Sequence, residues 1–323
     1  MSTDTAPARA QDASRTDGVR TDGSLTDGTR AVPDEVPRWF RAGHETTLGV
    51  LTRPVVPARD VGVIFLNGGH GGSSAGKNRV HTRMADDLAR RGFNSLRVEW
   101  HGIGDSTGEI DEFVMDDPFV DEALGAVQVL RDEGISRVAI YGECFGARTA
   151  VVCQDQIPEL CAMFLVTLVI RDGALSEQTP QRVVSDLDTG DFVKRLDRVR
   201  HLGDPEKRAL YLKLIRSKSK QLLTTAKLRA SGSRLEPWVS PQVVAGLDDL
   251  GARDIPVHLV YGTSYWDPHT GDFVRIRDDL RPMRHDSITA EIVDEMIAGY
   301  RTLHVQDRLI PMVGEWMDRA VPR

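Results

Sequence analysis

Residues 142–146 read Gly-Glu-Cys-Phe-Gly, between an apolar run at 137–141 and a stretch of helical periodicity at 145–157. A nucleophilic side chain with a glycine two positions before and after it is typical of a sharp, strained turn from strand to helix. The turn is predicted to lift Cys144 above a sheet and to place its sulfur at a helix N-terminus, where free amides favour the thiolate. A buried cysteine in a tight glycine turn is the alternative that the pentapeptide alone leaves open.

The chain around this turn alternates between short apolar runs and amphipathic stretches. Before the turn, apolar runs at 61–66 and 93–99 indicate buried strands, and residues 79–91 and 117–133 have helical spacing. After the turn, another apolar run covers residues 161–170. This β-α-β rhythm predicts an α/β fold with a mostly parallel, doubly wound sheet that carries helices on both faces.

The rhythm breaks between residues 171 and 254, where several amphipathic segments occur without a convincing strand. It resumes with predicted strands at 256–261 and 289–293 and a final helix from about 306 to 320. We therefore predict four segments: a disordered tail at 1–35, a first part of the core at 36–170, a helical cap at 171–254, and a second part of the core at 255–323.

The predicted tail is rich in Thr, Asp, Gly, Ser and Ala and offers almost nothing to bury. Thr-Asp-Gly recurs in it every five residues, at 16–18, 21–23 and 26–28. A calcium-binding loop needs more ligands than this repeat supplies, so the composition favours disorder.

Composition and motifs exclude several classes of function. A formal net charge of −7 argues against nucleic acid or an anionic membrane as a partner, and no apolar run approaches the ~20 residues of a membrane span. Metal-ligand spacings, phosphate loops and dinucleotide signatures are missing, so no metal or cofactor is expected. The three cysteines form no CxxC pair and no secretory signal is visible, which predicts a reducing, cytoplasmic setting. Cys153 and Cys161 are predicted to pack in the core.

Three segments together resemble the α/β-hydrolase superfamily over residues 46–320: the strand and Asn-Gly-Gly loop at 61–69, the turn Glu-Trp-His-Gly-Ile-Gly-Asp-Ser at 99–106, and the nucleophile turn at 142–146. The second segment is similar to the turn after the fourth strand that many members write D-x-x-G-x-G-x-S. Gly-Lys-Asn-Arg-Val at 76–80 is similar to members encoded beside natural-product assembly lines. The resemblance implies an α/β-hydrolase fold in which the helical insertion caps the active site.

The resemblance also implies two backbone N–H donors that stabilise a tetrahedral oxyanion. One belongs to Phe145, directly after the nucleophile, and the best match for the other is Gly69 in the loop after the third strand. Glycine at this loop lets the backbone approach a substrate closely. His70 either lines the same pocket or lies exposed on the loop.

The remaining members of the triad follow from chain order, in which the nucleophile precedes the acid and the acid precedes the histidine. His304 follows the last predicted strand and precedes the last predicted helix, so we predict it as general base and acid. The family usually places this histidine well before the final helix, where Ala298 stands here, so the triad is either rebuilt from His304 or absent; His285 is a weaker substitute. Asp267 is predicted to orient the imidazole, with Asp272 as the alternative acid.

A cysteine nucleophile suits reversible movement of an acyl group between thiols. The chain resembles the cysteine aminoacyl shuttles and thioesterases of nonribosomal peptide and polyketide pathways. This implies an acyltransferase or thioesterase acting on carrier-protein or coenzyme A thioesters. A small-ester or lactone hydrolase of the dienelactone-hydrolase kind is the alternative, and a non-catalytic or non-hydrolytic protein of the same fold stays open because of Ala298.

A basic run at 207–229 contains eight Lys or Arg residues. It is either a solvated helix face or a docking surface for an acidic partner such as an acyl carrier protein.

Overall fold

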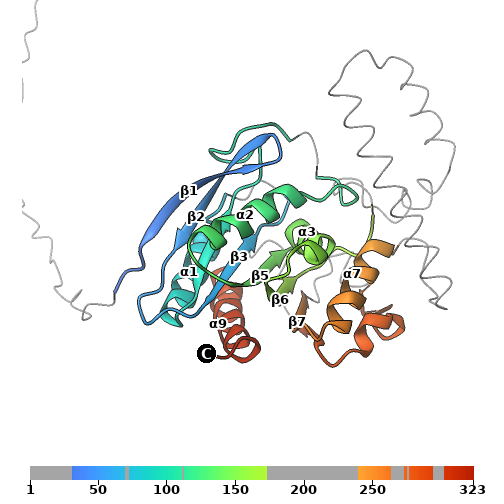
Figure 1. The fold of residues 1–323 in the computed structure, drawn as a ribbon. Coiled ribbons are helices and arrows are strands. Elements are labelled where there is room, and N and C mark those ends of the chain that lie inside the picture. Colours follow the sequence, from blue (N-terminus) through green and yellow to red (C-terminus); the bar gives the residue numbers. More distant parts are fainter. Residues whose placement is uncertain are drawn as a thin grey trace, which may run out of the picture. The chain divides into compact units, whose positions relative to one another are not determined.

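An eight-stranded sheet organises the chain (Figure 1). The computed structural model describes residues 31–69, 73–110, 113–172, 239–262, 273–274, 276–293 and 302–323. The strands are β1 (Glu35–Ala42), β2 (Glu45–Thr52), β3 (Val61–Leu66), β4 (Asn94–Val98), β5 (Arg137–Glu143), β6 (Leu160–Val166), β7 (Val257–Gly262) and β8 (Ile288–Val293). Their order in the sheet is β1-β2-β4-β3-β5-β6-β7-β8. Strand β2 pairs antiparallel with β1 and β4, and every other pairing is parallel, which confirms the predicted mostly parallel sheet.

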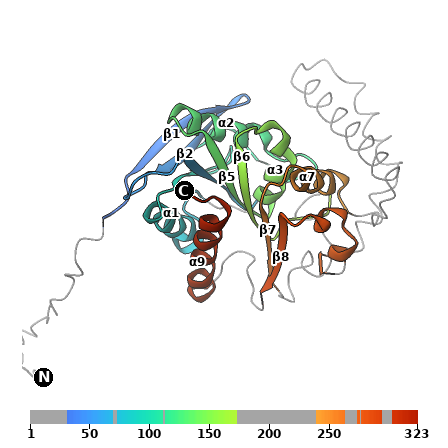
Figure 2. The same cartoon turned by 60° about the horizontal axis from the view of Figure 1, so that its bottom comes forward.

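Helices cover both faces of this sheet (Figure 2). The described helices are α1 (Val80–Arg90), α2 (Val120–Asp132), α3 (Phe145–Cys153), α7 (Pro241–Ala252) and α9 (Leu303–Ala320), with 3-10 turns η1 (Lys77–Arg79), η2 (Gln154–Gln156), η5 (Arg277–Asp279) and η6 (Arg281–Arg284). One face packs against α1 and α9, and the other packs against α2, α3 and α7. Because the central strands are covered on both sides, every residue of β3 is buried, which explains its uninterrupted apolar run.

The topology places the nucleophile turn beside the segment between β3 and α1, which begins with Asn67-Gly68-Gly69 and is called the glycine loop below. The chain passes from β3 to β4 on one side, and β5 pairs with β3 on the other side. In such a sheet, ligands bind where the strand order reverses, at the carboxyl ends of the strands. Leu66 at the end of β3 is in register with Gly142 in β5, so the segments that follow both strands emerge together.

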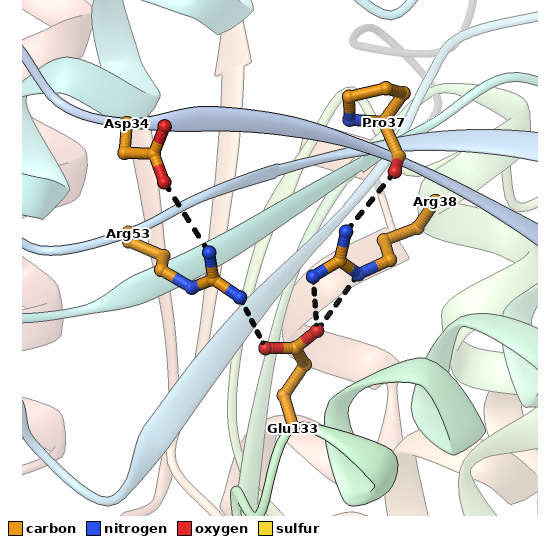
Figure 3. Close-up of polar contacts among 5 residues, drawn as sticks. All are labelled: Asp34, Pro37, Arg38, Arg53 and Glu133. Carbon is orange, nitrogen blue, oxygen red and sulfur yellow. Dashed lines mark hydrogen bonds and ion pairs between the residues drawn. The ribbon is translucent and has the colours of Figure 1, made fainter.

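The β1–β2 hairpin lies outside the strands that the sequence pattern predicts, since β1 alternates between exposed and half-buried positions at the edge of the sheet. Ion pairs tie this hairpin to the end of α2 (Figure 3). The Glu133 carboxylate accepts hydrogen bonds from Arg38 Nη2 at 2.6 Å and from Arg53 Nη2 at 2.8 Å, and Arg53 also reaches Asp34 at 3.3 Å.

Helix α7 lies within the stretch that the sequence assigns to the cap, yet it packs against α3 and contributes buried Val243 and Leu247 to the core. An isolated antiparallel bridge joins Arg171 to Val239, so the chain has returned to the core by residue 239, earlier than the boundary at 254. The rest of the predicted cap, with its basic run, and residues 1–30 of the predicted tail lie outside the described residues.

Candidate active site

Cys144 occupies a strained turn between β5 and α3. Its backbone angles are φ 49° and ψ −109°, a combination that costs a residue other than glycine on the order of 1–3 kcal/mol. Its N–H donates to the carbonyl of Val166 at 2.9 Å, and its carbonyl accepts from the N–H of Arg148 at 3.1 Å in the first turn of α3. Neighbouring strand and helix therefore hold the turn in this geometry, and a strained residue held in this way is a common mark of a functional site.

The two glycines of the motif are needed because backbone approaches them closely. A Cβ atom on Gly146 would overlap the carbonyl oxygen of Leu66 and lie 2.6 Å from that of Asn67. A Cβ atom on Gly142 would lie 2.7 Å from Cα of Ala147. Larger residues at either position would push the turn away from β3 or from the start of α3.

The loop after β3 lies directly beside the nucleophile. A Cβ atom on Gly68 would be 3.5 Å from the Cβ of Cys144. A Cβ atom on Gly69 would be 2.9 Å from Cγ of Phe113, and the ring of Phe113 packs 4.9 Å from the ring of Phe145, centroid to centroid. The two residues predicted to supply oxyanion donors thus share one aromatic neighbour.

An aromatic cluster fixes the start of α3. The Phe145 ring is fully buried and meets Trp100, Phe113 and Phe119 edge to face, at centroid distances of 5.8, 4.9 and 4.7 Å. Edge-to-face packing is a directional contact, so the backbone of Phe145 has little freedom to rotate. A fixed backbone is what an N–H donor toward a developing oxyanion requires.

Glu99 braces the glycine loop from the turn after β4. Its buried carboxylate accepts hydrogen bonds from the N–H of Ser74 at 3.1 Å, the hydroxyl of Ser74 at 3.0 Å and the N–H of Asp105 at 3.2 Å. The neighbouring Trp100 donates its indole N–H to the carbonyl of Asn67 at 3.2 Å. Consecutive residues of this turn therefore hold both sides of the loop that carries Gly69.

His304 lies in the first turn of α9 and is exposed. The helix begins at Leu303, so the prediction that His304 precedes the last helix is wrong. Thr302 sets this earlier start because its side chain caps the helix, accepting from the N–H of Val305 at 3.4 Å.

His285 lies at the amino ends of the parallel strands, whereas Cys144 lies at their carboxyl ends. It precedes β8, and in a parallel array the amino ends of strands lie away from the carboxyl end of β5. Its Nε2 is 3.2 Å from Oδ1 of Asp248 in α7, so it anchors the turn before β8 and does not substitute as the base. The predicted acids Asp267 and Asp272, together with His70 and Ala298, lie outside the described residues.

Two residues beside the turn carry no signal in the sequence. His81, in α1, places Nε2 at 3.4 Å from Oε2 of Glu143, the residue before Cys144. His81 falls on the buried face of an amphipathic helix, where the pattern predicts only packing, and Glu143 is one of the two variable positions of the motif. Their partnership depends on the packing of α1 against the end of β5.

The other two cysteines differ from Cys144 in their surroundings. Cys153 is fully buried at the end of α3, and burial raises its pKa to about 12. Burial also raises the pKa of Cys161, in β6. Thiols of this kind react slowly with electrophiles at neutral pH, because little thiolate is present.

In the part of the chain that the structure describes, no group of three or more His, Cys, Asp or Glu side chains is arranged to hold a metal ion. None of the described helices is long and apolar enough to cross a membrane.

The sequence matches no protein-family model, and a search of curated proteins found no match. Solved structures do match. An esterase from Pyrococcus furiosus superposes with a TM-score of 0.54 at 15% identity, covering 89% of this chain and 93% of the esterase. A dienelactone hydrolase from Anabaena variabilis gives 0.54 at 14% identity, covering 89% and 98% of the two chains. The chain has the α/β-hydrolase fold.

An α/β-hydrolase from Penicillium supports the same assignment, with a TM-score of 0.54 at 17% identity over 91% of this chain and 100% of that one. At identities this low the likeness establishes the α/β-hydrolase fold, as predicted, and leaves the reaction to be argued from the residues of the site.

Proposed function

We propose that this chain is an acyl-transfer enzyme that uses Cys144 as its nucleophile. In the first half of the reaction the Cys144 thiolate attacks the carbonyl carbon of a donor thioester. The carbon–sulfur bond to the donor breaks, and the donor thiolate leaves and takes up a proton. An acceptor thiol, amine, alcohol or water then attacks the enzyme thioester, loses its proton and releases Cys144 as thiolate.

The observation that carries this proposal is the strained turn of Cys144 at the N-terminus of α3, with Gly68 packed against it. The positive end of the helix dipole favours a thiolate at this place. A substrate carbonyl oxygen bound beside the sulfur would have the backbone of α3 on one side and the backbone of the glycine loop on the other. A structural cysteine would have no need of an outlying backbone conformation, which persists only where surrounding contacts hold it.

The remaining roles are proposed from chain order and from the resemblance to the superfamily. The N–H groups of Phe145 and Gly69 stabilise the oxyanion, and His304 relays the proton between acceptor and leaving group. Asp267, or Asp272 in its place, orients the imidazole of His304.

Intact-protein mass after incubation with acyl thioesters of coenzyme A tests the proposal. We expect a mass increase equal to one acyl group, located on Cys144 by peptide mapping and lost in Cys144→Ala. The matched control, Cys161→Ala, should be acylated like the wild type. A wild-type chain that forms no adduct with any thioester and hydrolyses none would contradict the proposal and favour a non-catalytic role.

The second candidate is a small-ester or lactone hydrolase, since the same thiolate can open a lactone and the superposed dienelactone hydrolase shares the fold. Release of product from a small lactone, faster than from any thioester and abolished in Cys144→Ala, would favour this candidate. Transfer of the acyl group to an added thiol or amine, faster than hydrolysis, would favour the transferase.

An acyl carrier protein is the partner we propose, with the basic run at 207–229 as its contact. Reversal of Lys213, Arg216 and Lys220 to Glu is expected to slow acylation by a carrier-protein thioester at least ten-fold. Acylation by a small free thioester should change less than two-fold. Equal losses with both donors, or a carrier-protein rate that salt does not lower, would remove the docking role.

A further inference from the structure

Glu143 and His81 form a largely buried polar pair directly beneath the turn that carries Cys144. Glu143 ends β5 and is joined to Cys144 by a peptide bond, while His81 belongs to the first turn of α1. The two side chains are only 13% and 4% exposed, and 3.4 Å separates Oε2 of Glu143 from Nε2 of His81. With so little of its surface exposed, the Glu143 carboxylate is poorly solvated, so its interactions with neighbouring groups carry more weight.

The pair touches both ends of the glycine loop. A Cβ atom on Gly68 would lie 3.5 Å from the carboxyl carbon of Glu143, the same distance as from the Cβ of Cys144. Further along the loop, a Cβ atom on Gly76 would lie 2.7 Å from Nδ1 of His81. Glu143 thus packs where the loop leaves β3, and His81 packs where it joins α1.

Apolar rings surround the histidine and hold it in place. The ring of His81 lies 6.0 Å from the rings of Phe65 and Tyr141, centroid to centroid, on the face of the sheet that α1 covers. A negative charge interacts strongly with its neighbours in such surroundings, since few dipoles screen it. The negative charge of the Glu143 carboxylate would therefore repel a thiolate on Cys144, the next residue, and disfavour its formation.

We propose that His81 is a positioning residue that holds the Glu143 carboxylate on the α1 side of β5, away from the sulfur of Cys144. This inference rests on the proposed role of Cys144 as nucleophile. It assigns His81 an effect on reactivity that acts through Glu143, without contact to substrate.

The test measures the rate of iodoacetamide alkylation at Cys144, which reports thiolate reactivity without any substrate. His81→Leu is expected to slow alkylation at least five-fold, because the carboxylate loses the imidazole that lies beside it and is free to approach the sulfur. His81→Gln, which keeps a polar side chain beside the carboxylate, should retain more than half of the wild-type rate. Glu143→Gln should raise the rate about two-fold or more, because the charge is removed.

The deciding comparison is between Glu143→Gln and the double variant Glu143→Gln/His81→Leu. With the charge gone, loss of His81 should change the alkylation rate less than two-fold, whereas a purely structural histidine would slow both backgrounds alike. Where thermal melting shows that His81→Leu alone does not fold, slowing of the double variant relative to Glu143→Gln by more than two-fold overturns the inference by itself. Equal slowing in the two backgrounds would overturn the inference.

His258 supplies a matched control, since it makes a similar contact to Glu291, 3.5 Å away, between β7 and β8. His258→Leu should leave alkylation of Cys144 within two-fold of wild type. Acyl adduct formation by the wild-type chain is measured separately, so the two proposals fail in different ways. An adduct on Cys144 with no rescue by Glu143→Gln overturns only the role of His81, and the rescue pattern without an adduct overturns only acyl transfer.

Discussion

Gly146 is the residue at which the site tolerates a side chain least. A Cβ atom there would overlap backbone oxygen of β3, which cannot move without shifting the sheet. We predict that Gly146→Ala lowers the free energy of unfolding by about 3 kcal/mol or more, in urea titrations, and abolishes alkylation of Cys144 at neutral pH.

Gly134 provides the comparison for this prediction. It has φ 77°, yet a Cβ atom on it would have no neighbour within 4 Å. Gly134→Ala should therefore cost only the left-handed backbone conformation, about 1–2 kcal/mol, and leave alkylation intact. A Gly146→Ala variant no less stable than Gly134→Ala would show that the turn can move away from β3.

At the scale of single residues, the sequence indicates whatever is local to a motif. Cys144, Phe145 and Gly69 can be named as candidates from spacing and resemblance, because the strained turn and the loop impose glycine at fixed places. Glu143 and His81 are not identified from the sequence, because their contact depends on how α1 packs against β5. No local pattern records that packing.

Among the elements, the turn after β4 is the one on which the glycine loop depends most. Glu99→Ala would leave the buried donors of Ser74 and the part-buried N–H of Asp105 without their acceptor. We predict that the free energy of unfolding, measured by urea titration, falls by about 2–3 kcal/mol and that the acylation rate falls with it. Asp105→Ala, which removes only an exposed side chain, should change stability by less than about 0.5 kcal/mol, and a similar loss in both variants would contradict the bracing role.

The hairpin of β1 and β2 makes a second prediction at this scale, through Glu133. Burial would raise the pKa of Glu133, but hydrogen bonds from Arg53 and Arg38 outweigh it and hold the pKa below its ordinary value. A lowered carboxyl pKa stabilises the fold above the unfolded-state pKa, and this stabilisation disappears as the pH falls through the folded-state pKa. Glu133→Gln should therefore cost about 1 kcal/mol at pH 7 and almost nothing near pH 2.5.

Urea unfolding of wild type and Glu133→Gln across this pH range checks the expectation. Asp34→Asn, which alters the more exposed arm of the same cluster, is the control and should have a smaller effect at every pH. A difference between wild type and Glu133→Gln that stays constant down to pH 2.5 would exclude the charge as its cause.

Elements with a buried face were predictable, and those at the margins were not. Strands such as β3 and β5 are buried on both faces, so each appears in the sequence as a continuous apolar run that predicts it. Strand β1 lies at an edge, where its positions alternate between exposed and half-buried and no apolar run marks it. Helix α9 begins early because Thr302 caps it. The contribution of α7 to the core could not be predicted, because an amphipathic helix has the same sequence pattern whether it packs within a cap or against a sheet.

For the whole molecule, the fold makes the three thiols unequal. In the native chain we predict that iodoacetamide at neutral pH labels Cys144 alone, since burial raises the pKa of Cys153 and Cys161. In urea all three should be labelled at similar rates. Peptide mapping after brief exposure distinguishes these outcomes, and native labelling of Cys153 ahead of Cys144 would contradict the assignment of the reactive thiol.

Under the proposed role of Cys144, the pairing of β3 with β5 also decides when its thiol becomes reactive. Leu66 and Gly142 meet across the sheet although α1, β4 and α2 lie between them in sequence. Contacts of such long range form late, because closing a long loop costs entropy before any contact stabilises it. In the proposed enzyme, a nascent or partly folded chain therefore carries an ordinary thiol at Cys144, and the reactive form arises only together with the completed sheet.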